Sequence, residues 1–129
     1  MAVSEDQVRL AVPATPEYLR LARVTATGLA SRLGFTFDEV EDLRLAIDEL
    51  CFALIGTKGR AGTVQLKYLI HPGALEVEGI GAFSDRPEAG AVTVSELSER
   101  ILDALVDEHE VRPDGDQPTF RLLKRHIGP

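Results

Sequence analysis

The chain opens with a stretch in which large apolar residues alternate with charged or small ones. This period of two predicts a β-strand over residues 8–12, which Pro13 ends. The spacing then changes to three and four residues, which predicts a helix from Thr15 to about Leu33 with one buried stripe. The residues of this stripe are Leu19, Ala22, Ala26, Leu29 and Leu33. Thr15 and Pro16 are typical of the N-cap and the first turn of a helix.

A second helix is predicted from Thr36 to near Gly56. Thr36 and Glu39 have the spacing of a capping box, in which two side chains satisfy backbone N–H groups that the helix leaves without partners. A strong apolar stripe follows, made of Val40, Leu43, Ile47, Leu50, Cys51 and Leu54. Four residues fall away from this stripe and flank Glu49, namely Leu45, Ala46, Phe52 and Ala53. We therefore expect this helix to have two contact surfaces.

Strand spacing returns in the middle of the chain. Residues 63–70 and 74–80 alternate again, and the turn residues 71–73 separate them. This pattern predicts an antiparallel hairpin. Residues 83–92 are rich in turn formers and form the next connection.

The last third of the chain predicts one helix and a second hairpin. Thr93 and Glu96 repeat the capping-box spacing at the start of a third helix. Its expected inward residues are Val94, Leu97, Ile101 and Leu105. Residues 110–112 and 119–125 have strand character and flank a turn-rich segment, so they predict a final hairpin.

The order of these elements predicts the fold class. Helices with one apolar stripe, together with alternating strands, favour an α+β, two-layer α/β sandwich with helices on one face of a mixed, mostly antiparallel sheet. With 129 residues, the chain is long enough for one core. We therefore expect a single domain over residues 1–129.

Composition excludes several classes of function. The chain has 14 Lys and Arg against 21 Asp and Glu, and its net charge of -7 argues against binding to a nucleic-acid backbone. No apolar run reaches the ~20 residues of a membrane span, and residues 1–6 lack the pattern of a signal peptide. We expect a cytoplasmic protein with no nucleic acid and no membrane as partner.

Metal and disulfide chemistry are not expected either. Cys51 is the only cysteine, so no disulfide can form within the chain. The histidines His71, His109 and His126 lie too far apart in sequence for a local metal motif.

Four segments between residues 8 and 55 carry a specific resemblance. They are residues 12–19 (VPATPEYL), 22–25 (ARVT), 31–36 (SRLGFT) and 42–51 (DLRLAIDELC). In these segments the chain resembles the bacterial anti-sigma-factor serine kinases, which belong to the GHKL superfamily of histidine-kinase-like ATPases. The resemblance implies the histidine-kinase-like ATPase fold, here with a shortened lid. It also implies binding of a sigma factor and ATP-dependent phosphorylation of a serine on a STAS-type antagonist.

The family's nucleotide site can be compared with this sequence residue by residue. The resemblance assigns a catalytic glutamate and, four residues later, a magnesium-binding asparagine to the second helix. Glu49 matches the acid, but Ala53 stands at the asparagine position, and a methyl group cannot coordinate magnesium. Gly79 and Gly81 match a glycine turn that approaches the adenine, but the aspartate that precedes it in the family is missing.

The phosphate-binding part departs from the family as well. Residues 83–92 replace the glycine-rich lid, and Glu96 brings negative charge to the start of the third helix. We therefore expect a degenerate member in which Glu49 is a relict base. Glu49, Ala53, Gly79 and Gly81 would line a vestigial nucleotide site, with no cofactor bound and no metal ligands. ATP and magnesium enter only if the chain is instead an active kinase.

The expected partners also follow from the resemblance. Arg23 matches a first-helix arginine that contacts the sigma factor and the antagonist in the family, and Arg20 lies one turn before it. Leu45 and Phe52 either add to this partner surface or pack under the lid segment. Expected partners are a sigma factor, a STAS-domain antagonist and, since family members are commonly dimers, a second copy of the chain.

Three functions stay open at this point. The first is an anti-sigma-factor-like binding protein that has lost nucleotide binding and takes part in transcription regulation, as in a bacterial stress response. The second is an active ATP-dependent protein-serine kinase that phosphorylates a STAS protein. The third is a fold retained only as a protein-interaction or dimerisation module.

Overall fold

The computed structural model of the chain describes residues 6–84, 94–113 and 117–127. The elements, in chain order, are β1 (Asp6–Pro13), α1 (Pro16–Arg32), α2 (Phe37–Ile55), β2 (Gly62–His71), β3 (Ala74–Phe83), α3 (Glu96–Leu105), β4 (Glu108–Arg112) and β5 (Thr119–Arg125). This order of strands and helices is the one that the apolar spacing predicts.

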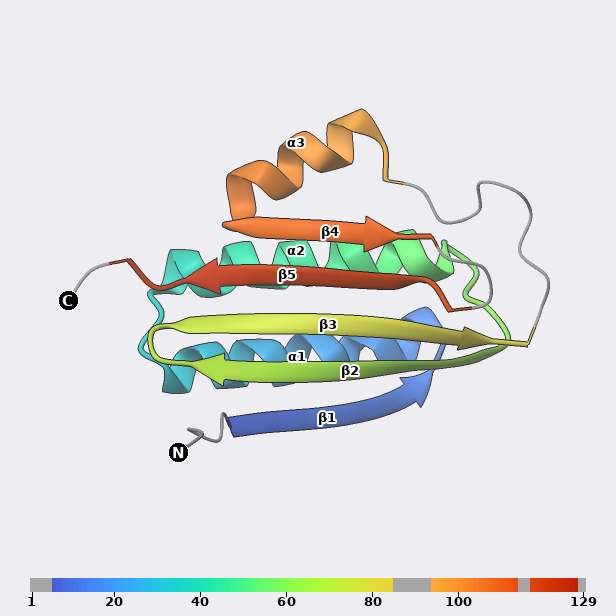
Figure 1. Ribbon diagram of the computed structural model, residues 1–129, viewed down its shortest axis with the longest axis horizontal. Coiled ribbons are helices and arrows are strands. Elements are labelled where there is room, and N and C mark those ends of the chain that lie inside the picture. Colours follow the sequence, from blue (N-terminus) through green and yellow to red (C-terminus); the bar gives the residue numbers. More distant parts are fainter. Residues whose placement is uncertain (1–5, 85–93, 114–116, 128–129) are drawn as a thin grey trace.

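The strands of the described residues form one five-stranded sheet in the order β1-β2-β3-β5-β4. Every pairing between neighbouring strands is antiparallel. Helices α1 and α2 lie side by side on one face of the sheet, and α3 lies along β4 at the edge opposite β1 (Figure 1). The predicted α+β sandwich is confirmed.

The core fills the space between the sheet and the stripes of α1 and α2. On α1 the stripe consists largely of alanines, and Ala22, Ala26 and Ala30 are fully buried. These small side chains let the helix lie close to β2, where the Tyr68 hydroxyl donates a hydrogen bond of 2.9 Å to the carbonyl of Ala22. On α2 the buried residues are Leu43, Ala46, Ile47, Leu50, Cys51, Leu54 and Ile55, together with Glu39.

The helix starts agree only in part with the predicted caps. The capping box of α2 is confirmed, since Glu39 N–H donates to Thr36 Oγ1 at 3.1 Å and Thr36 N–H donates to Glu39 Oε1 at 2.8 Å. Thr15 stands at the N-cap of α1, but its side chain makes no capping hydrogen bond. The cap of α3 is Ser95, which accepts from Ser98 N–H at 3.0 Å; Thr93 lies outside the described residues.

Apolar positions in two helices, α2 and α3, differ from the predicted pattern. Ala46 is fully buried although it falls outside the predicted stripe of α2. In α3 the expected inward residues Leu97 and Ile101 are 68% and 39% exposed, and Leu102 is the buried residue. The helix is therefore rotated about its axis relative to the prediction, because Leu102 joins the central core.

Strand β3 also differs from its predicted bounds. It continues past Ile80 through Gly81 to Phe83, so Gly79 and Gly81 both lie inside a strand and not in a turn after it. Pairing explains the extension, because Gly81 lies opposite Val64 of β2 and its N–H donates to the carbonyl of Pro118 at 2.9 Å.

Candidate functional site

Helix α2 has two sides that face different neighbours. The Lys124 ammonium, on the inner face of β5, donates to the carbonyl of Leu105 at the end of α3 at 2.7 Å. The same group lies 3.5 Å from the carboxylate of Asp42 on α2. Asp42 therefore marks the side of α2 that faces α3. Asp48 marks the side of α2 that faces α1, where it forms an ion pair with Arg23.

The predicted nucleotide residues of α2 lie on the α3 side. Glu49 and Ala53 follow Asp42 by two and three helical turns, which puts them on the same side of the helix. Both residues are half-buried. Within the described residues, Glu49 makes no hydrogen bond or ion pair.

Aromatic rings cover the two glycines of β3. A Cβ atom at Gly79 would lie 2.3 Å from Cε2 of Phe120, the residue opposite it on β5. A Cβ atom at Gly81 would lie 2.4 Å from Cε2 of Phe83, which follows it on the same face of the strand. Phe120 is 2% exposed and Phe83 is 9% exposed. Each glycine thus makes room for a phenylalanine of the same sheet.

The ring of Phe83 is also held from another direction. The guanidinium carbon of Arg60, in the loop between α2 and β2, lies 3.9 Å from the centre of this ring, which is cation–π geometry. The rings of Phe83 and Phe120 therefore fill the space beside Gly79 and Gly81 on this face of β3.

The remaining predicted parts of the nucleotide site can be placed only partly. Glu96 begins α3 and pairs with Arg100 at 3.2 Å, so its negative charge has a partner on the same helix. Of the predicted lid, residues 83–92, residues 85–92 lie outside the described part of the chain. In the described part of the chain, no three His, Cys, Asp or Glu side chains are grouped so that they could hold a metal ion. No described helix is long and apolar enough to cross a membrane.

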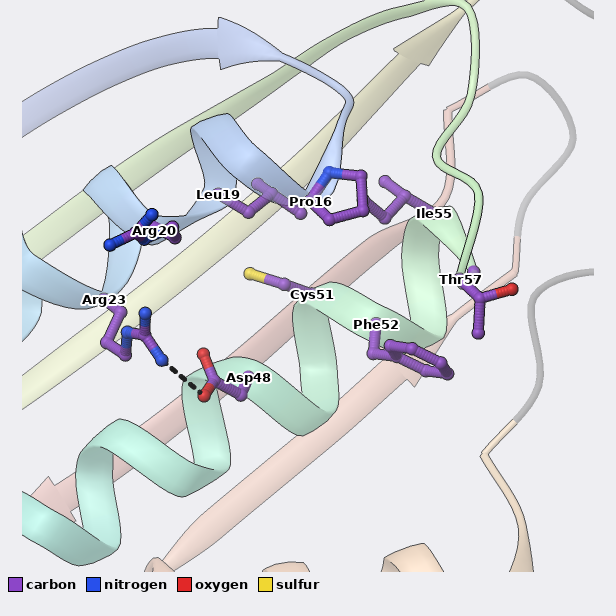
Figure 2. Close-up of a pocket in the computed structure, with 10 residues that line it drawn as sticks. Pro16, Leu19, Arg20, Arg23, Asp48, Cys51, Phe52, Ile55 and Thr57 are labelled. Atoms are coloured by element: carbon purple, nitrogen blue, oxygen red, sulfur yellow. Dashed lines mark hydrogen bonds and ion pairs between the residues drawn. The ribbon is translucent and has the colours of Figure 1, made fainter.

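A groove of about 340 Å³ separates α1 from α2 on the other side of α2. Figure 2 shows Arg20 and Arg23 of α1 at one end of the groove and Phe52 with Thr57 at the other. Leu19, Cys51 and Ile55 contribute further lining atoms. The groove therefore combines an apolar floor with two guanidinium groups.

Arg23 is already engaged within the chain. Its Nη1 lies 3.1 Å from Oδ2 of Asp48, and the two side chains are 27% and 45% exposed. Arg44 approaches the same carboxylate at 4.0 Å. An ion pair this exposed contributes little to stability, about 0–1 kcal/mol, so a partner's carboxylate could compete with Asp48 for Arg23.

Three of the four predicted partner residues come together here. Arg20, Arg23 and Phe52 line the groove, and Phe52 is 54% exposed. Leu45 lies two turns before Phe52 on the outer face of α2, is 43% exposed and does not line the groove. Cys51 is 4% exposed, and burial raises the pKa of its thiol to about 12, so the thiol packs and does not react.

Sequence reasoning missed three residues whose contacts shape the two candidate sites, namely Asp48, Phe83 and Phe120. Asp48 precedes Glu49 directly, and only the pairing of α1 with α2 shows that it holds Arg23. Phe83 could have been found, because it continues the period of two through Gly79 and Gly81 and so predicts a longer strand. Phe120 could not, because its contact with Gly79 depends on the register between β3 and β5.

Comparisons with known proteins agree with this fold. The family model of the histidine kinase-like ATPase domain matches residues 12–122. Serine-protein kinase RsbW of Bacillus pumilus is 32% identical over 127 residues, which cover 83% of this chain and 78% of that protein. The protein of the same name from Bacillus subtilis is 32% identical over 130 residues, with 87% and 81% covered.

A solved structure extends the comparison to three dimensions. The structure of the RsbU and RsbW domains of Rv1364c from Mycobacterium tuberculosis matches 96% of this chain with a TM-score of 0.70. The identity is 18%, so this match supports the fold alone, and the chain spans 33% of the length of that protein.

Proposed function

Because the chain belongs to the RsbW serine-protein kinases of the histidine kinase-like ATPase family, we propose that it keeps a partner-binding role and has lost phosphotransfer. It acts as an anti-sigma-factor-like regulator that sequesters a sigma factor, binds a STAS-type antagonist, or binds each in turn. Binding of this chain, and not a reaction that it catalyses, determines whether the sigma factor is sequestered. This function would place the protein in the cytoplasm with its targets.

The observation that carries the loss of nucleotide binding is the filling of the glycine positions. Phe83 and Phe120 occupy the space next to Gly79 and Gly81, and Ala53 offers no oxygen to a metal. A nucleotide would have to displace two buried rings and bind without a protein ligand for its magnesium. Loss of each hydrogen bond to a charged group costs about 1.5–3 kcal/mol.

Titration with magnesium-ATP tests this part directly. We expect a dissociation constant weaker than about 1 mM, which corresponds to about -4 kcal/mol. Isothermal titration calorimetry of the purified chain measures it. Binding tighter than this limit would show that the rings move aside, and the loss of the site would be disproved.

The α1–α2 groove supports the binding role. Arg20 and Arg23 offer two positive charges at one end of the groove and the exposed ring of Phe52 lies at the other, on a chain whose net charge is -7. Aromatic and arginine side chains of this kind dominate the energy of protein interfaces. We propose that the partner inserts an apolar side chain into the groove and places a carboxylate near Arg23.

Matched substitutions test the groove. Arg23→Ala and Phe52→Ala should each weaken binding to the partner by about 2 kcal/mol, or roughly 30-fold, in surface plasmon resonance with sigma factors and STAS proteins of the same genome. Arg100→Ala and Leu97→Ala remove a more exposed arginine and a more exposed apolar side chain from α3 and should have no effect. Equal losses in both pairs would reject the groove as the partner site.

An active serine kinase is the second candidate, because Glu49 is retained and the relatives are named serine-protein kinases. Transfer of labelled phosphate from ATP to a STAS protein, abolished by Glu49→Ala, would establish it. If the chain captures neither a sigma factor nor a STAS protein, the fold serves as an interaction module with another partner.

A further inference from the structure

The groove between α1 and α2 has one charged end and an apolar remainder. Arg20, Arg23 and Asp48 lie at the charged end, and Leu19 and Cys51 lie between the two ends (Figure 2). The residues at the far end carry no charge, and they are Pro16, Phe52, Ile55 and Thr57. A molecule that fits this groove along its length therefore has one polar end and an apolar body.

The charged end holds more positive than negative charge. Arg23 and Arg44 share the carboxylate of Asp48, at 3.1 and 4.0 Å. Arg44 also pairs with Glu41 at 2.9 Å. Arg20 lies one turn before Arg23 and makes no hydrogen bond or ion pair within residues 6–84, 94–113 and 117–127. One guanidinium group is therefore left over, on a chain whose net charge is -7, and a single anionic group would balance it.

The size of the groove limits the apolar body of such a molecule. The groove extends along α1 from Pro16 to Arg23 and along α2 from Asp48 to Ile55, which is about two helical turns, or about 10 Å. Its volume of about 340 Å³ corresponds to roughly ten groups of the size of a water molecule. A methylene group is similar in size, so a head group with an unbranched chain of about eight carbons fills the groove.

We propose that the α1–α2 groove also binds a small amphiphilic monocarboxylate, with its carboxylate at Arg20 and its unbranched chain along the groove toward Phe52. A carboxylate accepts two parallel hydrogen bonds from one guanidinium group, which suits the free side chain of Arg20. The chain would cover part of the ring of Phe52, which is 54% exposed. A second charge on the molecule would lose its water among apolar side chains, so a dicarboxylate does not fit.

This ligand would regulate the proposed function of the chain. Its chain and its carboxylate take the positions that the proposed function gives to an apolar side chain and a carboxylate of the protein partner. The ligand and the partner therefore compete for the groove. Competition rests on the proposed function, whereas binding of the ligand to the free chain does not.

Three probes with the same eight-carbon chain test the site by ¹H–¹⁵N NMR titration of the labelled chain at pH 7. Octanoate should bind with a dissociation constant on the order of 0.1–1 mM and shift the signals of residues 16–23 and 48–57. Octan-1-ol, which has no charge, should bind about fivefold more weakly. Octylamine, which is positively charged, should not saturate the groove at up to about 5 mM.

The length of the chain is tested separately. From butanoate to octanoate, each added methylene should tighten binding by about two- to fourfold, because the groove is open on one side and buries only part of each group. The gain should stop near decanoate, where the chain is longer than the groove. A gain that continues to longer chains without a limit would mean non-specific adsorption and would overturn the site.

Substitutions test the two ends of the groove. Arg20→Gln should make octanoate bind no better than octan-1-ol, and the exposed position of Arg20 means that the fold tolerates the change. Phe52→Ala should weaken both probes by the same factor, because it removes a wall of the groove and no charge. The matched control is Arg9→Gln, which removes an exposed arginine from β1 and should change neither.

The outcomes separate this ligand site from the proposed function. Equal binding of octanoate and octylamine, signal shifts outside the groove, or an unchanged octanoate affinity in Arg20→Gln overturns the site. If Arg23→Ala weakens binding of the protein partner but octanoate does not bind, the ligand site is disproved and the proposed function stands. If octanoate fills the groove without displacing a sigma factor or a STAS protein, the competition is disproved.

Discussion

Glu39 joins the start of α2 to the C-terminal segment, and its removal should destabilise the fold in a pH-dependent way. Its Oε1 accepts from Thr36 N–H at 2.8 Å and lies 2.7 Å from Nδ1 of His126. Its Oε2 accepts from Ile127 N–H at 2.7 Å. The His126 ring also stacks on Phe35, with 5.8 Å between the ring centres. One carboxylate with 8% exposure therefore holds two ends of the structure together.

The pKa of Glu39 gives the size of the expected loss of stability. Burial by itself raises the pKa, but the N–H groups of Ile127 and Thr36 and the His126 ring outweigh it and lower the pKa from 4.5 to about 2. At about 1.4 kcal/mol per pKa unit, this difference is an upper bound of about 3 kcal/mol. Ile127 is 77% exposed, so water replaces part of its bond, and we expect about 2 kcal/mol for Glu39→Gln at pH 7.

The direction of the pH dependence follows from the linkage between protonation of Glu39 and folding. A carboxylate with a pKa lower in the folded than in the unfolded state stabilises the fold above pH 4.5, and this contribution is lost as the pH falls towards 2. Urea unfolding followed by circular dichroism at pH 7 and at pH 2.5 measures it. At pH 2.5 the difference between wild type and Glu39→Gln should shrink to about a quarter of its neutral value.

The matched control is Glu41→Gln. It makes the same chemical change on the same helix, but Glu41 lies at the surface, where it pairs with Arg44. Surface ion pairs contribute little, so stability should hardly change. If Glu39→Gln cost the same at both pH values, or no more than the control, the carboxylate would not be the connection described.

Three further changes test the packing around the proposed sites. Gly79→Ala should destabilise the fold by about 1–3 kcal/mol, because its Cβ would lie 2.3 Å from the ring of Phe120; an unchanged urea midpoint would contradict the contact. Tyr68→Phe should cost about 1–2 kcal/mol in thermal unfolding, because the carbonyl of Ala22 loses its buried 2.9 Å donor. Ala53→Asn should not lower the dissociation constant of magnesium-ATP below about 1 mM in calorimetry, because both rings remain in place. Tighter binding would refute the proposal that the rings block the site.

The long helices were predictable because their patterns are long. α1 has 17 residues and α2 has 19, so several turns repeat the same apolar stripe and fix which side of each helix is buried. α3 has only 10 residues, and Leu97, Ile101 and Leu102 allow two rotations of the helix. The buried contact of Leu102 with the central core selects one of them, and residue spacing within the helix carries no record of that contact.

The residues of the candidate sites also fall into two groups, those that the sequence could place and those that it could not. Local spacing was enough to place Arg20 and Arg23 one turn apart on one helix and to show that Ala53 offers no metal ligand. It was not enough for Gly79 and Gly81, because two glycines separated by one residue suit both a turn and a strand beside aromatic rings. Nor did it reveal that Asp48 holds Arg23, since that contact joins two helices.

The amino-acid sequence by itself therefore determined the order of the elements, the faces of the two long helices and the presence of an alanine, which offers no metal ligand, one turn after Glu49. Each of these depends on residues a few positions apart, whose relative placement the local backbone conformation dictates. The tertiary structure alone decided that Phe120 covers Gly79 and that Glu39 holds the C-terminal segment. These contacts join residues distant in the chain, and only strand register and helix packing bring them together.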